Sequence, residues 1–158
     1  MSGTEQANYC WLCVEDSPED YDVFKRTVKK AELPVTLLHC RDIEETIDLL
    51  DNFDDTSCAE RKVGPDIVFL DLNLPGADGY HVLKKIRARQ GMKKTPIIVL
   101  STSSNQEDVC KAYEMGANCY IAKPQDLQSY KEMVEALKMF WIDQAMIPKT
   151  IKRQFDAF

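Results

Sequence analysis

The sequence contains no apolar run that approaches the ~20 residues of a membrane-spanning helix. The first residues, Met1-Ser-Gly-Thr-Glu-Gln, carry neither the basic nor the apolar segment of a signal peptide. The 20 basic residues are outnumbered by 26 acidic ones, and the net charge of −6 argues against a face that binds duplex nucleic acid. These absences predict a cytoplasmic protein that binds neither membrane nor nucleic acid.

The six cysteines lack the pattern of a metal or redox site. No second C-x-x-C and no His-x-x-x-His is present, which argues against zinc. Cys10-Trp-Leu-Cys13 has redox spacing, but it lies in an apolar strand-like run, where residues three apart point to opposite faces. We therefore interpret most cysteines as buried thiols. A chain of 158 residues, 44% of them hydrophobic, is long enough to fold as one domain without disulfides.

Apolar runs alternate with amphipathic segments along the whole chain. Buried strands are predicted at residues 9–14, 35–40, 66–70, 96–100 and 119–122. Helices are predicted after each strand, near residues 17–31, 42–50, 79–86, 106–115 and 126–141. At the start of the first helix, Ser17 can act as the cap and Asp20 can close a capping box. Residues 51–65 are polar and irregular, which indicates a long loop. Five such units predict an α/β fold, a doubly wound five-stranded parallel sheet with helices on both faces.

The ends of the predicted strands carry the residues that indicate a function. In an open parallel sheet, ligands bind beyond the carboxyl ends of the strands. Those ends carry Glu15 and Asp16, Asp71, Ser101 and Thr102, and Lys123. Three carboxylates together repel one another without a cation, and a purely oxygen ligand set favours Mg²⁺. With a hydroxyl and an ammonium opposite, they predict a phosphoryl-binding site in which Asp71 forms an aspartyl-phosphate.

Each element of this site also has an ordinary explanation. Glu15-Asp16 would suit a solvated strand end, Asp71 a turn, Ser101 a helix cap, and Lys123-Pro124 a surface turn. Their joint occurrence at the ends of correctly ordered strands favours the assembled site. The chain has no G-x-x-x-x-G-K-[ST] loop for a free nucleotide, so we expect the phosphoryl group to be attached to the protein itself.

Residues 9 to 142 resemble the CheY-like receiver domains of response regulators in two-component signalling. The motifs that carry the resemblance are Val14-Glu15-Asp16, Asp66–Asp71, Leu74-Pro75, Asp78-Gly79, Ser101, Gly116-Ala117 and Lys123-Pro124. The resemblance implies a flavodoxin-like (βα)5 fold with strand order 2-1-3-4-5. Residues 1–8 would then be an N-terminal tail and residues 143–158 a C-terminal extension.

The resemblance also implies a role for each site residue. Asp71 would accept phosphate from the phosphohistidine of a sensor histidine kinase, making the chain a switch rather than an enzyme. The implied Mg²⁺ ligands are Glu15, Asp16, Asp71 and the main-chain carbonyl of Asn73. Glu15, longer than the commoner Asp, would reach the metal through water. The phosphoryl oxygens would be bound by Ser101, the main-chain amide of Thr102, and Lys123.

Two further features are implied near the last strand. Tyr120 matches the aromatic residue that moves with Ser101 and alters the face formed by the fourth helix, fifth strand and fifth helix. The Lys123–Pro124 peptide bond is expected to be cis. The loop at 51–65, the run Gly116-Ala-Asn-Cys-Tyr120 and Phe140-Trp141 are similar to those of the stand-alone response regulators that serve bacterial phytochromes and similar sensor kinases. We expect no DNA-binding output domain after Pro148.

The last predicted helix ends in four consecutive large apolar residues, Met139 to Ile142. Leu137 and Trp141 would face the core, whereas Phe140 would share an exposed side with Met133. Such a patch predicts a homodimer through this helix. The alternative is that the tail after Pro148 folds back over it.

Two other functions use similar folds or residues. A phosphatase of the haloacid dehalogenase type needs a second Asp two residues after the first, where this chain has Asn73. A flavodoxin-like FMN carrier would need a Ser/Thr-rich phosphate loop where Glu15-Asp16 stands, and these carboxylates would repel the phosphate.

Overall fold

The computed structural model describes residues 9–54, 64–74 and 78–148. Five parallel strands form one sheet in the order β2-β1-β3-β4-β5, which confirms the predicted topology. The strands are β1 (Tyr9–Val14), β2 (Val35–Cys40), β3 (Ile67–Asp71), β4 (Ile97–Ser101) and β5 (Cys119–Ala122). The helices are α1 (Pro18–Lys30), α2 (Ile43–Asp54), α3 (Gly79–Ala88), α4 (Gln106–Glu114) and α5 (Leu127–Leu137). The predictions for residues 1–8, 55–63, Pro75 and 149–158 lie outside the described residues.

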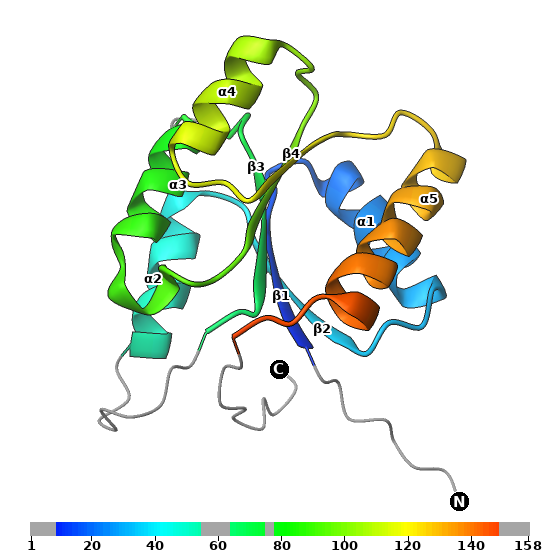
Figure 1. Cartoon of the computed structure of the whole chain (residues 1–158), viewed down its shortest axis with the longest axis horizontal. Coiled ribbons are helices and arrows are strands. Elements are labelled where there is room, and N and C mark those ends of the chain that lie inside the picture. Colours follow the sequence, from blue (N-terminus) through cyan, green and yellow to red (C-terminus); the bar gives the residue numbers. More distant parts are fainter. Residues whose placement is uncertain (1–8, 55–63, 75–77, 149–158) are drawn as a thin grey trace, which may run out of the picture.

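The helices cover both faces of the sheet (Figure 1). Helices α1 and α5 lie on one face, and α2, α3 and α4 lie on the other. Side chains of β3 alternate between the two layers, with Val68 and Leu70 in the core beneath α2 to α4 and Ile67 and Phe69 in the core beneath α1 and α5. Because both faces are covered, β3 is buried throughout, which explains its uninterrupted apolar sequence.

The strand register aligns the carboxyl ends of β1, β3, β4 and β5. Val14 of β1 pairs with Leu70 of β3, and Asp71 pairs with Leu100 of β4. Ser101 in turn pairs with Ala122 of β5. The residues that follow these pairs therefore meet at one edge of the sheet, at the top of Figure 1.

Helix α1 begins at this edge with the predicted cap. Ser17 is the N-cap residue, and its side chain accepts a hydrogen bond from the backbone N–H of Asp20. The second half of the expected capping box is absent, since the backbone N–H of Ser17 donates to Glu15 Oε1 (3.1 Å). Glu15 thus replaces Asp20 in that half of the box and leaves the Asp20 carboxylate available for another partner.

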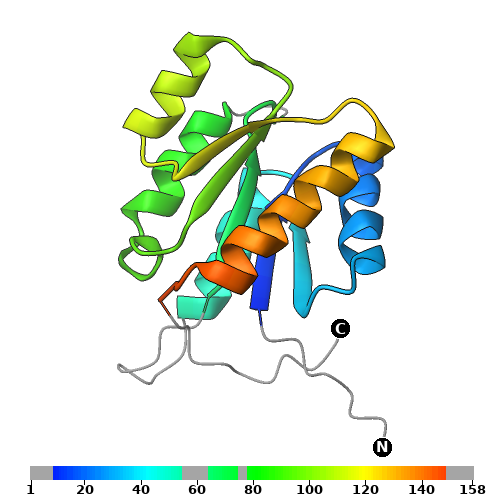
Figure 2. The same cartoon turned by 45° about the vertical axis from the view of Figure 1, so that its right-hand side comes forward.

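Some predicted boundaries were wrong. Helix α2 continues to Asp54, within the segment predicted as a loop, and a short 3₁₀ helix, Gln90–Met92, was not predicted. Helix α5 ends at Leu137, and a π-helix, Lys138–Gln144, continues it (Figure 2). Apolar periodicity indicates a helix, but it does not distinguish the last turns of an α-helix from a short π-helix, because the apolar residues in the sequence are the same in both cases.

The π-helix changes which apolar residues are exposed. Trp141 packs against the core beneath α1 and α5 as predicted, while Met139 and Phe140 are 66% and 57% exposed. Met133 is buried in that core, so the expectation that it shares an exposed side with Phe140 is wrong. The wider turn rotates the residues after Leu137 relative to those before it.

The cis prediction for Lys123–Pro124 is also wrong. All peptide bonds of the described residues are trans. The trans form is favoured before proline by about 0.5–1 kcal/mol. With this trans bond, the Lys123 backbone N–H donates to Ser101 O (2.7 Å) and its side chain still reaches Asp71. The turn therefore has no need of the less stable isomer.

Cys10 and Cys13 are both buried free thiols on β1. Burial raises the pKa of the Cys10 thiol to about 12, so the reactive thiolate is scarce near neutral pH. This environment agrees with the structural interpretation of the cysteines. In the described part of the chain, no helix is both long and apolar enough to cross a membrane.

Candidate functional site

Asp71 occupies the centre of the carboxyl edge. It is the last residue of β3, and its side chain is buried. Its Oδ1 accepts a hydrogen bond from the backbone N–H of Asn73 (3.0 Å), and its Oδ2 accepts one from Lys123 Nζ (3.1 Å). A carboxylate held in this way has a fixed orientation and a compensating positive charge.

Two acidic residues that follow β1 lie beside Asp71. Carboxylate oxygens of Glu15, Asp16 and Asp71 lie within 4.8 Å of one another. Burial, with the nearby charge of Asp71, raises the pKa of Glu15 to about 7 even though Lys123 opposes the shift. Burial is the larger cause of this rise, and the carboxylate of Asp71 adds to it; a hard cation would relieve the repulsion between the two carboxylates. The donor set therefore fits a divalent metal ion. The water-mediated contact expected of Glu15 stays a prediction.

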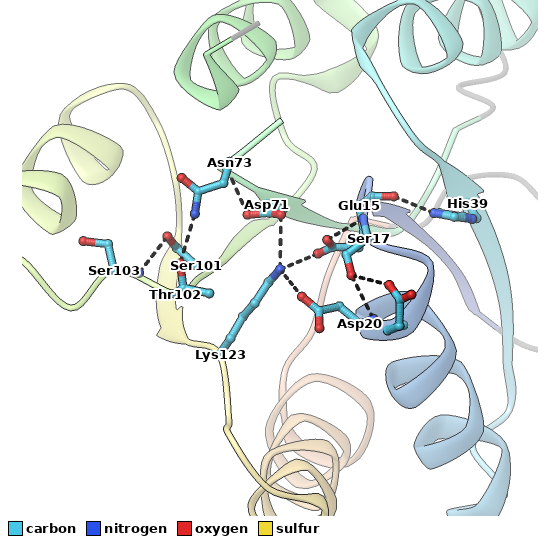
Figure 3. A network of polar contacts seen from close by, with 11 residues as sticks. Glu15, Ser17, Asp20, His39, Asp71, Asn73, Ser101, Thr102, Ser103 and Lys123 are labelled. Atoms are coloured by element: carbon cyan, nitrogen blue, oxygen red, sulfur yellow. Dashed lines mark hydrogen bonds and ion pairs between the residues drawn. The ribbon is translucent and has the colours of Figure 1, made fainter. Parts of the chain in front are cut away.

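Lys123 connects three carboxylates (Figure 3). Its Nζ lies 2.7 Å from Glu15 Oε2, 2.9 Å from Asp20 Oδ2 and 3.1 Å from Asp71 Oδ2. Burial alone would lower the pKa of Lys123, but hydrogen bonds to Glu15 and Asp20, with the charges of Glu15 and Asp71, raise it above the ordinary value. Lys123 is therefore held as an ammonium ion at the edge of the site.

Asp20 also lies at this site, although the sequence pattern did not indicate it. It lies in the first turn of α1, only four residues after Asp16, and its side chain reaches back to Lys123. The proximity of that turn to the strand end was the signal that was available. The assignment of Asp20 to the capping box obscured it.

The ends of β3 and β4 are joined on the opposite side of Asp71. Asn73 Nδ2 donates to Thr102 Oγ1 (3.1 Å), and buried Ser101 Oγ accepts from the backbone N–H of Ser103 (3.2 Å). The Tyr120 hydroxyl donates to Ser103 O (2.9 Å). The structure thus brings the predicted pair Ser101 and Tyr120 to a shared neighbour, Ser103, in the loop before α4.

A second hydrogen-bonded group, also missed in the sequence, fixes this loop. Ser103 Oγ donates to Asp108 Oδ2 (2.6 Å), and the Tyr80 hydroxyl lies 3.0 Å from Asp108 Oδ1 and 3.1 Å from Asp108 O. Lys111 Nζ lies 4.0 Å from the centre of the Tyr80 ring. The loop after β4 is therefore connected both to Tyr120 on β5 and to Tyr80 on α3.

Comparisons with known sequences identify relatives over most of the chain. The family model of the response regulator receiver domain matches residues 11–135. Response regulator Rcp1 of Synechocystis sp. is 33% identical over 137 residues, which cover 87% of this chain and 91% of Rcp1. The probable methanogenesis regulatory protein FilR2 of Methanothrix harundinacea is 37% identical over 49% of this chain and 50% of its own length.

Solved structures give the same result. The phosphorylated cyanobacterial phytochrome response regulator RcpA is 32% identical and superposes with a TM-score of 0.78, over 90% of this chain and 100% of that one. The Mn²⁺-bound form of Rcp1 is 30% identical, with a TM-score of 0.76 over 89% and 99% of the two chains. Matches of this extent, in sequence and in fold, establish that the chain belongs to the response regulator receiver domain family.

Proposed function

We propose that a sensor histidine kinase phosphorylates Asp71 and that the chain acts as a signalling switch rather than as an enzyme. One observation carries this proposal: the buried carboxylate of Asp71 ends the central strand and accepts a hydrogen bond from Lys123 inside a cluster of carboxylates. Residues 9–142 would form the receiver domain, flanked by residues 1–8 and 143–158.

In the proposed transfer, a carboxylate oxygen of Asp71 attacks the phosphorus of a phosphohistidine. A P–O bond forms as the P–N bond breaks, and the electron pair of that bond leaves with the imidazole. Lys123, held as an ammonium, offsets the negative charge at Asp71. Ser101 and the main-chain amide of Thr102, at the end of neighbouring β4, would bind the phosphoryl oxygens.

The proposed metal ion is Mg²⁺. Glu15, Asp16, Asp71 and the main-chain carbonyl of Asn73 would hold it, and it would supply positive charge against the phosphoryl oxygens. The oxygen-only ligand set supports a divalent cation at this place, and so does the closeness of the Asp71 and Glu15 carboxylates. The Mn²⁺-bound structure of the relative Rcp1 agrees with it.

The proposed output is a change on the surface formed by α4, β5 and α5. Tyr120 on β5 donates its hydroxyl proton to Ser103 O, and its backbone N–H donates to the hydroxyl of exposed Tyr113 on α4. A movement of Ser101 toward a phosphoryl group would therefore displace Ser103 and alter this surface.

Phosphorylation by a small phosphodonor with Mg²⁺ tests the proposal. We expect wild-type protein to gain one acid-labile phosphate and Asp71→Asn to gain none, because the nucleophile is removed. Asp22→Asn is the matched control, since Asp22 is an exposed carboxylate of α1 that pairs with Arg26. Undiminished acid-labile phosphate on Asp71→Asn would refute the assignment of Asp71.

We further propose a phytochrome-like kinase as the partner, on the basis of the similarity to the phytochrome response regulator RcpA. The free cysteines of the described residues are compatible with a reducing compartment, and we propose the cytoplasm. Phosphate transfer from a purified phytochrome-type kinase, compared with transfer from an unrelated kinase, tests the partner. Equal rates from both would contradict a specific pairing.

We also propose a homodimer through α5 and the π-helix, supported by the exposed Met139 and Phe140. Sedimentation at micromolar concentration should give about twice 18.1 kDa, and Phe140→Glu should shift the protein toward monomer. Tyr113→Glu is the control, because Tyr113 is also exposed but lies on α4, outside the proposed interface. A monomer with and without beryllofluoride, a phosphoryl mimic, would contradict the dimer.

A further inference from the structure

The environment of Lys123 contains one carboxylate with no place in the proposed phosphoryl or metal site. An ammonium group has three N–H donors, and Lys123 Nζ lies within 3.1 Å of three carboxylate oxygens. Two of these belong to Glu15 and Asp71, which also form the carboxylate cluster. The third belongs to Asp20, which among the described residues is not part of that cluster.

The three contacts respond differently when the site is loaded. A phosphoryl group on Asp71 would place one of its oxygens where Asp71 Oδ2 now accepts a hydrogen bond from Lys123. A cation would compete with Lys123 for Glu15. Neither event involves the Asp20 carboxylate. Asp20 therefore remains a partner of Lys123 in both states, beside the phosphoryl oxygen that replaces Asp71 Oδ2.

The position of Asp20 suits a fixed support. Its backbone N–H is capped by Ser17 at the start of α1, so its carboxylate projects from a rigid first turn. Figure 3 shows Asp20 on the α1 side of Lys123, with Ser101 and Thr102 on the other side. A lysine side chain has four rotatable bonds, and it loses conformational entropy when it is ordered. A support on α1 reduces the number of positions open to the ammonium.

We propose that Asp20 is a positioning residue for Lys123, which keeps the ammonium beside Asp71 while Glu15 and Asp71 change partners. This inference rests on the proposed phosphorylation of Asp71. Asp20 does not touch the phosphoryl group in this scheme, and it acts only through Lys123. Asp20 accepts one N–H of the Lys123 ammonium group and leaves another N–H available to the phosphoryl oxygen.

The first experiment measures beryllofluoride binding in the presence of Mg²⁺. Asp20→Asn should weaken binding about tenfold, which corresponds to one charge-assisted hydrogen bond at a partly exposed carboxylate. Asp20→Glu retains the charge and should restore most of the affinity. Asp22→Asn is a matched control, because Asp22 lies on the same helix with similar exposure, 47% against 40%, and pairs with Arg26 instead. Unchanged or tighter binding by Asp20→Asn would overturn the inference.

A double-mutant cycle separates positioning from a general effect of charge. In a Lys123→Ala background, Asp20→Asn should produce no further loss of affinity, because the residue through which it acts is gone. A full additional tenfold loss in that background would overturn the inference. If wild-type protein bound no beryllofluoride at all, the proposed function would fail instead.

A second measurement needs neither metal nor phosphate. In wild-type protein the Lys123 side chain is only 8% exposed, so its ammonium protons should exchange slowly enough to give a ¹H–¹⁵N signal. Lys123→Ala assigns that signal. Asp20→Asn should broaden or remove it, Asp20→Glu should retain it, and Asp22→Asn should leave it unchanged. An unaltered signal in Asp20→Asn would show that Asp20 does not hold the ammonium.

Discussion

Gly79 at the start of α3 permits a close backbone contact beside the site. Its N–H donates to Leu72 O (3.0 Å), which folds the chain after Asp71 back on itself. A Cβ added at Gly79 would lie 2.3 Å from Leu72 Cα, 2.6 Å from Leu72 O and 2.7 Å from Leu72 C. These are main-chain atoms, so no side-chain rotation can relieve the overlap. Gly79→Ala must therefore move either Leu72 or the first turn of α3.

The expected cost of Gly79→Ala follows from this geometry. Overpacking a well-packed region costs about 1–3 kcal/mol, and a backbone clash belongs at the upper end. In a domain of this size each kcal/mol lowers Tm by about 2–4 °C, so about 3 kcal/mol predicts a decrease of roughly 6–12 °C. Thermal unfolding followed by circular dichroism measures this decrease, and phosphorylation of Asp71 should also slow because Leu72 adjoins it.

Gly64→Ala provides the matched control. A Cβ at Gly64 would meet only Met92 Sδ, at an ordinary 3.6 Å, so we expect its Tm to change little. A Tm for Gly79→Ala within about 2 °C of wild type, less than 1 kcal/mol on the same scale, would refute the reasoning. It would mean that the chain between β3 and α3 shifts without cost.

Three further predictions concern the site and the adjoining loop. Lys123→Ala should still accept phosphate, but the amide chemical shifts of its free and beryllofluoride-bound forms should differ less than in wild type. An equal difference would show that Lys123 does not transmit phosphoryl binding to the rest of the domain. Asp16→Ala should weaken Mg²⁺ binding in a titration more than Glu15→Ala does, because the longer Glu15 is already engaged by Lys123; the reverse order would contradict this assignment. Tyr80→Phe removes a buried hydroxyl that lies near two oxygens of Asp108, and should lower the free energy of unfolding in denaturant by about 1–2 kcal/mol. A smaller loss would show that this hydroxyl contributes little to stability.

The fold and the centre of the site could be predicted because topology restricts both. Once the pattern requires a parallel sheet, Asp71, Ser101 and Lys123 must share an edge, since each lies at the carboxyl end of a strand or directly after it. No knowledge of side-chain packing is needed for that step. Buried strands with apolar residues on both faces also have clear boundaries, so each predicted strand agrees with an observed one to within a residue.

The missed features depend on contacts between distant residues. Local sequence assigns Asp20 to a helix cap, but the buried ammonium of Lys123, 103 positions later, attracts its carboxylate. The isomer of Lys123–Pro124 and the π-helix after Leu137 depend likewise on how neighbouring elements pack. Periodicity describes one element at a time, so it does not report such contacts.

The direction of β1 has a practical consequence for attaching this domain to other molecules. Strand β1 starts at the sheet edge opposite Asp71, and Tyr9 at its start lies near the π-helix, where its hydroxyl approaches Ile142 O (3.5 Å). Both ends of the coloured ribbon therefore lie at the bottom of Figure 1. The six residues of β1, Tyr9–Val14, precede the acidic pair and span about 20 Å. A tether or label attached at either of these ends would lie away from the edge that carries Asp71, the proposed phosphoacceptor, so we expect immobilised protein to be suitable for measuring phosphotransfer directly.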